Sequence, residues 1–238
     1  MKYKPDEMMV VSIARLLKNG EKVFHGVASP VPMIAIQLAR ELHAPDMIYI
    51  NISGGVNPTP SHMPKSTVDN CLLEGSKSIF TLSDIFDLCA RGELDTAFLS
   101  AVQIDARGNL NTSVIGDFHS PKIRLPGGAG SAALLPKVKR AIIWRTKHDK
   151  KTFVESCDFV TATGNVEYVV SPLCVFKKIH NRLQPVIIFP GVSEELIQDR
   201  TGFALDFSYA KEASFPTEKE LHTLKKIDPQ EIRKIEFV

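Results

Sequence analysis

The sequence predicts an α/β protein built on an open, mostly parallel sheet with helices on both faces. Apolar residues recur at helical spacing over 9–17 and again over 33–42, and strand-like apolar segments follow at 22–28 and 47–52. The connections between these strands are too long for a hairpin. Strands joined in this way pair in parallel beneath covering helices, as in βαβ units.

The length of 238 residues allows one large α/β domain or two small ones. No internal repeat, low-complexity tract or linker interrupts the chain. We therefore expect a single domain over residues 1–238.

Short-range capping signals place the helix ends. Asp6 is expected to cap the first helix, Gly20 to end it, and Ser29-Pro30 to break the following strand before the second helix. Thr81 and Asp84 resemble a capping box, which predicts a helix that stops at Gly92.

The second half of the chain is predicted to continue with strands and to end in polar helices. Strands are expected over 96–104 and 110–115, as antiparallel neighbours, and over 141–145, 159–161 and 186–189. Later helices are expected to begin at Ser193, at Pro216-Thr217 and at Asp228-Pro229.

Composition excludes several classes of protein. The net charge of +2 gives no electrostatic reason to expect a nucleic acid or a membrane as partner. Apolar runs such as 141–144 are too short to cross a bilayer, and the acidic pair Asp6-Glu7 does not fit a secretory signal, so we expect a cytoplasmic protein. The four cysteines are widely spaced without a CxxC pair, so neither a metal site nor a disulfide framework is expected. A tightly bound cofactor is not expected either.

Two glycine-rich loops are the first places to look for a site. Gly54-Gly55 opens a loop directly after the strand at 47–52, and the carboxyl ends of parallel strands are where open α/β sheets bind ligands. Gly127, Gly128 and Gly130 precede a short helix of small residues, which lets backbone N–H groups approach an anion or an oxyanion. The spacing of these glycines matches neither a dinucleotide-binding fingerprint nor a phosphate-binding P-loop.

Four segments together resemble the B (β) chain of family I CoA-transferases, and most closely the corresponding chain of the glutaconate CoA-transferases. They are Gly26–Pro30, Gln103–Asp117, Leu125–Gly130 and Phe189–Val192. The resemblance implies an open α/β fold, an A subunit of similar fold, a heterotetramer, and acyl-CoA as substrate at the interface of the two subunits. In this family a glutamate of the B (β) chain attacks the thioester and carries CoA as a glutamyl thioester.

The resemblance places Ile52 at the position of that glutamate. An aliphatic side chain can neither attack a thioester nor accept CoA. Strand alternation predicts that Asn51 and Ser53 point away from the face that Ile52 occupies, and no histidine nearby in sequence would activate Ser53.

Two branches of the superfamily also lack the glutamate: a decarboxylase of 3-methylglutaconyl-CoA and a hydrolase that opens a ring of a steroid-derived CoA ester. The chain resembles the β chain of the decarboxylase at Gly26–Pro30 and at His43–Asp46, although that enzyme carries a cysteine where this chain has Ile52. The sequence therefore favours decarboxylation or carbon–carbon hydrolysis of a short acyl-CoA or dicarboxylyl-CoA. CoA transfer by another nucleophile and a non-catalytic scaffold role stay open as alternatives.

Each candidate site residue also has a purely structural interpretation. Gly54, Gly55, Gly127, Gly128 and Gly130 are expected to line the acyl or CoA pocket, or else to serve only tight connections. Asn57 is either a hydrogen-bond donor to the substrate or a turn residue. Asp117 and His119 are either an acid/base pair or ordinary loop residues. Arg124 either binds a carboxylate or phosphate or forms a salt bridge. His25 is expected to be a buried structural histidine, and Asp105 and Asn109 are expected to fix their own turn.

Overall fold

The structure is a computed structural model that describes residues 3–237. The described residues group into two compact units. The first takes in the residues up to Phe98 and those from Phe215 onward, and the second runs from Leu99 to Ser214. The single domain expected over 1–238 stays a prediction.

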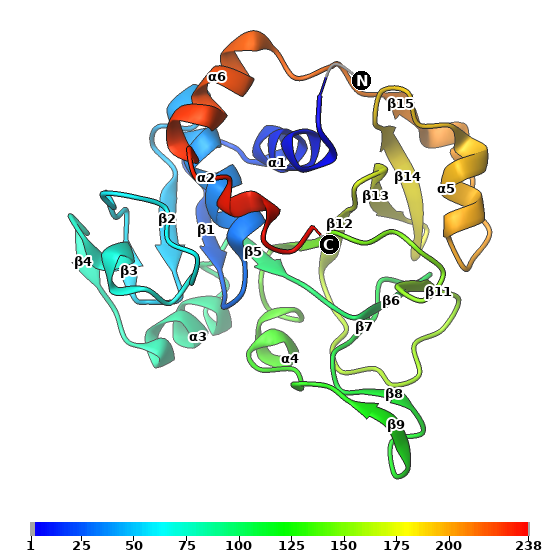
Figure 1. Cartoon of the computed structure of the whole chain (residues 1–238). Coiled ribbons are helices and arrows are strands. Elements are labelled where there is room, and N and C mark those ends of the chain that lie inside the picture. Colours follow the sequence, from blue (N-terminus) through cyan, green and yellow to red (C-terminus); the bar gives the residue numbers. More distant parts are fainter. Residues whose placement is uncertain (1–2, 238) are drawn as a thin grey trace. The chain divides into compact units, whose positions relative to one another are not determined.

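The first unit contains the β-α-β core that the sequence predicts (Figure 1). Its strands lie in the order β5-β1-β2-β3-β4. Strand β1 is parallel to both β5 and β2, whereas β3 is antiparallel to β2 and β4 is antiparallel to β3. The helices of this unit are α1 (Pro5–Leu16), α2 (Pro30–Leu42), α3 (Leu82–Ala90) and α6 (Glu218–Ile227), with 3₁₀ turns η1 (Asn70–Leu73) and η3 (Ile232–Lys234). The strands are β1 (Lys22–His25), β2 (Ile48–Asn51), β3 (Gly55–Val56), β4 (Ser78–Ile79) and β5 (Thr96–Leu99).

Helices α1, α2 and α6 pack on one another within this unit. Large side chains of α1, α2 and the strands are fully buried, among them Met9, Met33, Phe24 and Tyr49. Burial of apolar surface is the main source of stability here, at about 25 cal/mol per Å².

Local signals predicted most helix starts. The Thr81 N–H donates to the Asp84 carboxylate at 2.6 Å, and the Ser193 hydroxyl accepts from the Leu196 N–H at 3.2 Å, as capping requires. Three expectations about helix ends were wrong. Helix α1 ends at Leu16 and is capped by Leu17, so it does not extend to Gly20. Helix α1 begins at Pro5 instead of being capped by Asp6, because proline is favoured in the first turn. Asp228 ends α6, and only a 3₁₀ turn follows it.

The second unit is mixed in strand direction. Strands β10 and β12 are parallel, β12-β13-β14 form an antiparallel meander, and β15 is parallel to β14. The strands of its largest sheet are β10 (Arg140–Trp144), β12 (Val166–Val170), β13 (Cys174–Ile179), β14 (Arg182–Ile188) and β15 (Lys211–Glu212). Shorter pieces are β6 (Gln103–Asp105), β7 (Leu110–Asn111), β8 (Val114–Gly116), β9 (Pro121–Arg124), β11 (Phe153–Val154), α4 (Ser131–Leu134), α5 (Glu194–Arg200) and η2 (Phe207–Tyr209).

Three of the strands predicted from residue 96 onward differ from those in the structure. The segments expected at 96–104 and 110–115 are each split in two, although β6 and β7 do pair antiparallel as expected. The segment 159–161 is not a strand. The Thr161 N–H donates to the Leu110 carbonyl, and an isolated bridge joins Leu110 to Ala162. The α/β class itself is confirmed.

Within residues 3–237, no helix is long and apolar enough to cross a membrane. In the same range, no three His, Cys, Asp or Glu side chains are grouped as ligands for a metal ion. All four cysteines are free thiols, and burial raises the pKa of Cys174 to about 12.

Two buried histidines predict acid sensitivity. Burial lowers the pKa of His148 to about 3 and that of His25 to about 4, from the ordinary value of 6.5. The unfolded chain therefore binds protons that the folded chain excludes. The contribution of the two neutral histidines to the free energy of unfolding is fully present above pH 6.5. As the pH falls from there toward the folded pKa of each histidine, that histidine lowers the free energy of unfolding by about 1.4 kcal/mol per pH unit.

The expected result is a urea unfolding free energy that declines steeply between about pH 6 and pH 4.5. Replacing His148 with Gln should flatten part of this slope, whereas the same change at the exposed His222 should leave it unaltered. A stability that is constant over this range would contradict the burial argument.

Candidate active site

The turn that follows β2 is the first candidate region. The Gly54 N–H donates to the Asn51 carbonyl at 3.1 Å, which closes a turn with Ile52 and Ser53 at its centre. Gly54 adopts φ +102°, and a Cβ there would lie 2.5 Å from the Phe80 carbonyl oxygen. A side chain at Gly55 would lie 2.5 Å from the Leu72 carbonyl oxygen. Both glycines are therefore needed for close packing of this turn.

The Asn51 side chain holds the turn in shape. Its amide donates to the Leu72 carbonyl at 2.9 Å, and its side-chain oxygen accepts from the Gly55 N–H at 3.1 Å. Strand β2 ends at Asn51, so the expected strand alternation of Ile52 and Ser53 was wrong. Ile52 is half-buried within the turn.

The hydroxyl of Ser53 points at backbone carbonyls. It donates to the carbonyls of Thr67 and Asp69 at 3.5 and 3.4 Å. No described histidine lies within hydrogen-bond distance of this hydroxyl, so it has no activating base in this chain.

Asn57 occupies a left-handed turn position, with φ +48°. Its side-chain oxygen accepts from the Tyr49 N–H at 2.8 Å, and its own N–H donates to the Tyr49 carbonyl. The oxygen of its amide is thus committed to the fold, while its NH₂ group stays the candidate donor.

His25 and Tyr49 form a buried, neutral pair beside this region. Nδ1 of His25 donates to the Gly26 carbonyl at 3.0 Å, so Nε2 is unprotonated and accepts the Tyr49 hydroxyl at 2.6 Å. Burial raises the pKa of Tyr49 far above its usual value. The expected structural role of His25 agrees with this geometry.

The glycine loop of the second unit is held by a cluster of hydroxyl-bearing residues. The Gly127 N–H donates to the Thr112 carbonyl, and the Thr161 hydroxyl both accepts from the Thr112 N–H at 3.0 Å and pairs with the Ser113 hydroxyl at 2.7 Å. A Cβ at Gly128 would lie 2.8 Å from the Thr161 methyl group. Sequence reasoning missed Thr161, because the residue lies far along the chain from the loop that it supports.

This loop presents unused backbone donors. Gly127 and Ala129 have φ of +92° and +43°, while Gly130 has φ −77°, an alternation that turns successive N–H groups toward one side. Among residues 3–237, the N–H groups of Gly128, Ala129 and Gly130 have no acceptor, and the buried hydroxyl of Thr112 has no partner either. Free donors of this kind suit a developing oxyanion.

The other candidates lie on the β8–β9 hairpin. The Asp117 carboxylate accepts the backbone N–H groups of His119 and Ser120 at 2.8 and 2.9 Å, and both Asp117 and His119 are exposed. The guanidinium of Arg124 lies 5.2 Å from the centre of the Phe118 ring. It also donates a hydrogen bond to the backbone carbonyl of Phe118. The structure thus gives Asp117 and Arg124 local partners and forms no Asp117–His119 side-chain bond.

Asp105 and Asn109 fix their own turn as expected. The Asp105 carboxylate accepts the N–H groups of Arg107 and Asn109 and the Asn109 amide, each within 2.9 Å.

The α/β fold with glycine loops after its strands agrees with the CoA-transferase family that the sequence resembles. The chain belongs to the family described as Coenzyme A transferase, whose sequence profile matches residues 6–197. The predicted family resemblance is confirmed.

Individual relatives cover almost the whole chain. The β chain of the 3-oxoadipate CoA-transferase of Pseudomonas knackmussii is 33% identical over 95% of this chain and 94% of its own. The β chain of the glutaconate CoA-transferase of Acidaminococcus fermentans is 29% identical over 95% of this chain and 93% of its own. This chain is therefore the B (β) chain of an enzyme of the CoA-transferase family.

A solved decarboxylase is similar in structure. The decarboxylase AibA/AibB matches with a TM-score of 0.92 at 30% identity and covers 98% of both chains. The glutaconate CoA-transferase of Acidaminococcus fermentans matches with a TM-score of 0.88 at 26% identity, over 99% of this chain and 98% of its own. Relatives with transferase and decarboxylase names thus share this fold.

Proposed function

We propose that the chain acts with an A subunit on a short acyl-CoA or dicarboxylyl-CoA thioester by decarboxylation or carbon–carbon hydrolysis. The proposal rests on Ile52, which the sequence resemblance assigns to the position of the family's glutamate. A half-buried aliphatic side chain in the turn after β2 offers no atom that can attack a thioester. The expected cytoplasmic location and the heterotetramer stay predictions.

The polar side chains next to the turn have hydrogen-bond partners within this chain. Asp69 is exposed, and its carboxylate accepts the Cys71 N–H at 2.9 Å, a hydrogen bond that lowers the pKa of Asp69. Ser53 is bound to backbone carbonyls. In this proposal the turn therefore does not carry the acyl group.

The free N–H groups of the 127–130 loop supply the electrostatic part of the mechanism. In decarboxylation the bond to the leaving carboxyl group breaks, CO₂ departs, and the electron pair moves into the thioester as an enolate. The N–H groups of Gly128 to Gly130 donate to the enolate oxygen, and one such donor is worth roughly 3 kcal/mol of barrier. A proton supplied by the A subunit is then added to the carbon that lost the carboxyl group.

Product analysis tests this proposal. The complex of both subunits is incubated with 3-methylglutaconyl-CoA or glutaconyl-CoA together with isotope-labelled acetate. We expect mass spectrometry to show loss of CO₂ or cleavage of the acyl chain, with no labelled acetyl-CoA. Rapid formation of labelled acetyl-CoA would contradict the proposal and establish transfer.

Substitutions distinguish a catalytic role of this chain from a non-catalytic scaffold role. Alanine at Asn57, His119 or Arg124 should lower turnover if these groups contact substrate, and a Gly128→Val change should lower it by displacing the loop against Thr161. A complex that keeps full turnover with every one of these changes would support a scaffold role for this chain.

A further inference from the structure

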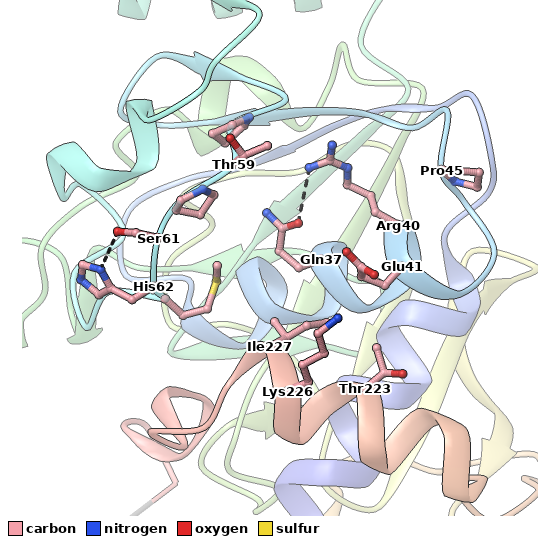
Figure 2. Close-up of a pocket in the computed structure, with 13 residues that line it drawn as sticks. Gln37, Arg40, Glu41, Pro45, Thr59, Ser61, His62, Thr223, Lys226 and Ile227 are labelled. Atoms are coloured by element: carbon pink, nitrogen blue, oxygen red, sulfur yellow. Dashed lines mark hydrogen bonds between the residues drawn. The ribbon is translucent and has the colours of Figure 1, made fainter.

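A polar pocket of about 420 Å³ opens in the first unit between α2, α6 and the segment 58–63. Figure 2 shows side chains of α2 and α6 gathered around it, with the 58–63 segment passing alongside. Polar groups in its lining include Gln37, Arg40, Ser61, His62, Thr223 and Lys226. The volume lies within the usual range for small-molecule sites, roughly 300–1,000 Å³.

The pocket lies away from the turn that follows β2. Helix α2 begins after the carboxyl end of β1 and ends before the amino end of β2. Gln37, Arg40 and Glu41 belong to its last turns, and Pro45 belongs to the connection into β2. This wall is therefore near the amino ends of the strands, whereas Ile52 follows the carboxyl end of β2.

Arg40 is a partly buried cation that forms no direct ion pair, although the charge of the nearby Glu41 favours its protonated form. Its guanidinium donates to the Gln37 side-chain oxygen at 3.4 Å, and among residues 3–237 it forms no ion pair. Partial burial lowers the pKa of Arg40, which reflects the cost of holding a cation out of water. By contrast, Arg15 of α1 binds the Glu220 carboxylate at 2.7 Å.

A second cation reaches the pocket from another element. Lys226, in the last turn of α6, has no ion pair among the described residues. Glu41 is the one acidic side chain among the described residues that line the pocket, so cations outnumber acids there even before His62 is counted. The cavity is therefore an electropositive site on a chain whose overall charge is close to neutral.

Neutral groups complete the lining. The hydroxyls of Ser61 and Thr223 and the Gln37 amide are hydrogen-bonding groups, and Met63 and Ile227 add apolar side chains to the lining. The lining therefore offers hydrogen-bonding groups together with some apolar surface.

We propose that this pocket binds a small organic anion, with its phosphate or carboxylate group held between Arg40 and Lys226. A guanidinium can bind either group through two N–H donors, and an ammonium adds a point charge. Met63 and Ile227 contact the body of the ligand. Binding here does not depend on the reaction that the enzyme catalyses.

Isothermal titration calorimetry on the full chain at low ionic strength tests the proposal with two probes, inorganic phosphate and glutarate. We expect at least one probe to bind, with the tighter probe identifying the preferred group. Arg40→Met and Lys226→Met should each weaken binding roughly tenfold or more, as loss of a charged hydrogen-bond donor requires. Lys226 is exposed, so its variant should fold even if the Arg40 variant does not.

Lys225→Met is the matched control. Lys225 lies in the same turn of α6 but does not line the pocket, so binding to this variant should equal that of the unaltered chain. Absence of binding by both probes, or equal weakening by the Lys225 and Lys226 changes, would overturn the proposal.

Discussion

Replacing Ile52 with glutamate should give this chain a CoA-transfer activity. The change puts a carboxylate, which can act as a nucleophile, in the half-buried turn at the position that the family resemblance assigns to the nucleophile. Labelled acetyl-CoA should then form from acyl-CoA and labelled acetate at least about tenfold faster than with the unaltered complex, a barrier change of about 1.4 kcal/mol.

The matched control is Ile52→Gln, which has the shape of glutamate but no nucleophilic carboxylate. It should form labelled acetyl-CoA no faster than the unaltered chain. Transfer by the Gln variant, or no gain from the Glu variant in a folded complex that still binds acyl-CoA, would argue against the assignment of this position.

Replacing Arg233 with methionine should cause the largest loss of stability. The Arg233 guanidinium binds Asp6 at 2.7 Å and Asp228 at 2.8 Å, and its side chain is only 5% exposed. Removing it leaves two buried carboxylates without this counter-ion, which should cost about 3–5 kcal/mol in the free energy of unfolding. Chemical denaturation of the full chain measures this loss.

Arg182 supplies the comparison for this change. Its pair with Glu155 has a separation of 3.4 Å and is exposed on both sides, so Arg182→Met should cost no more than about 1 kcal/mol. Equal effects of the two substitutions would mean that burial does not govern the strength of these ion pairs.

Local chemistry made much of the fold predictable. The capping residues Thr81, Ser193 and Thr217 act on groups three residues away, so their effect is visible in a short window of sequence. The β-α-β pattern of the first unit follows from alternating apolar periods in the same way.

Long-range contacts account for what was missed. The segment 159–161 has strand-like residues, yet Thr161 donates to Leu110 of β7 next to an isolated bridge, and no regular strand forms. Strand β2 stops at Asn51 because the amide of that residue binds Leu72, a contact that no local pattern reveals. The pocket at Arg40 and Lys226 joins elements from opposite ends of the chain.

The central claim is that no carboxylate of this chain carries CoA during turnover. Intact-mass analysis of the chain, after the complex is mixed with acyl-CoA and trapped with borohydride, tests it most directly. We predict an unmodified mass for this chain while product accumulates. A CoA adduct, or its reduced alcohol, mapped by peptide analysis to a carboxylate such as Asp69 would contradict the claim.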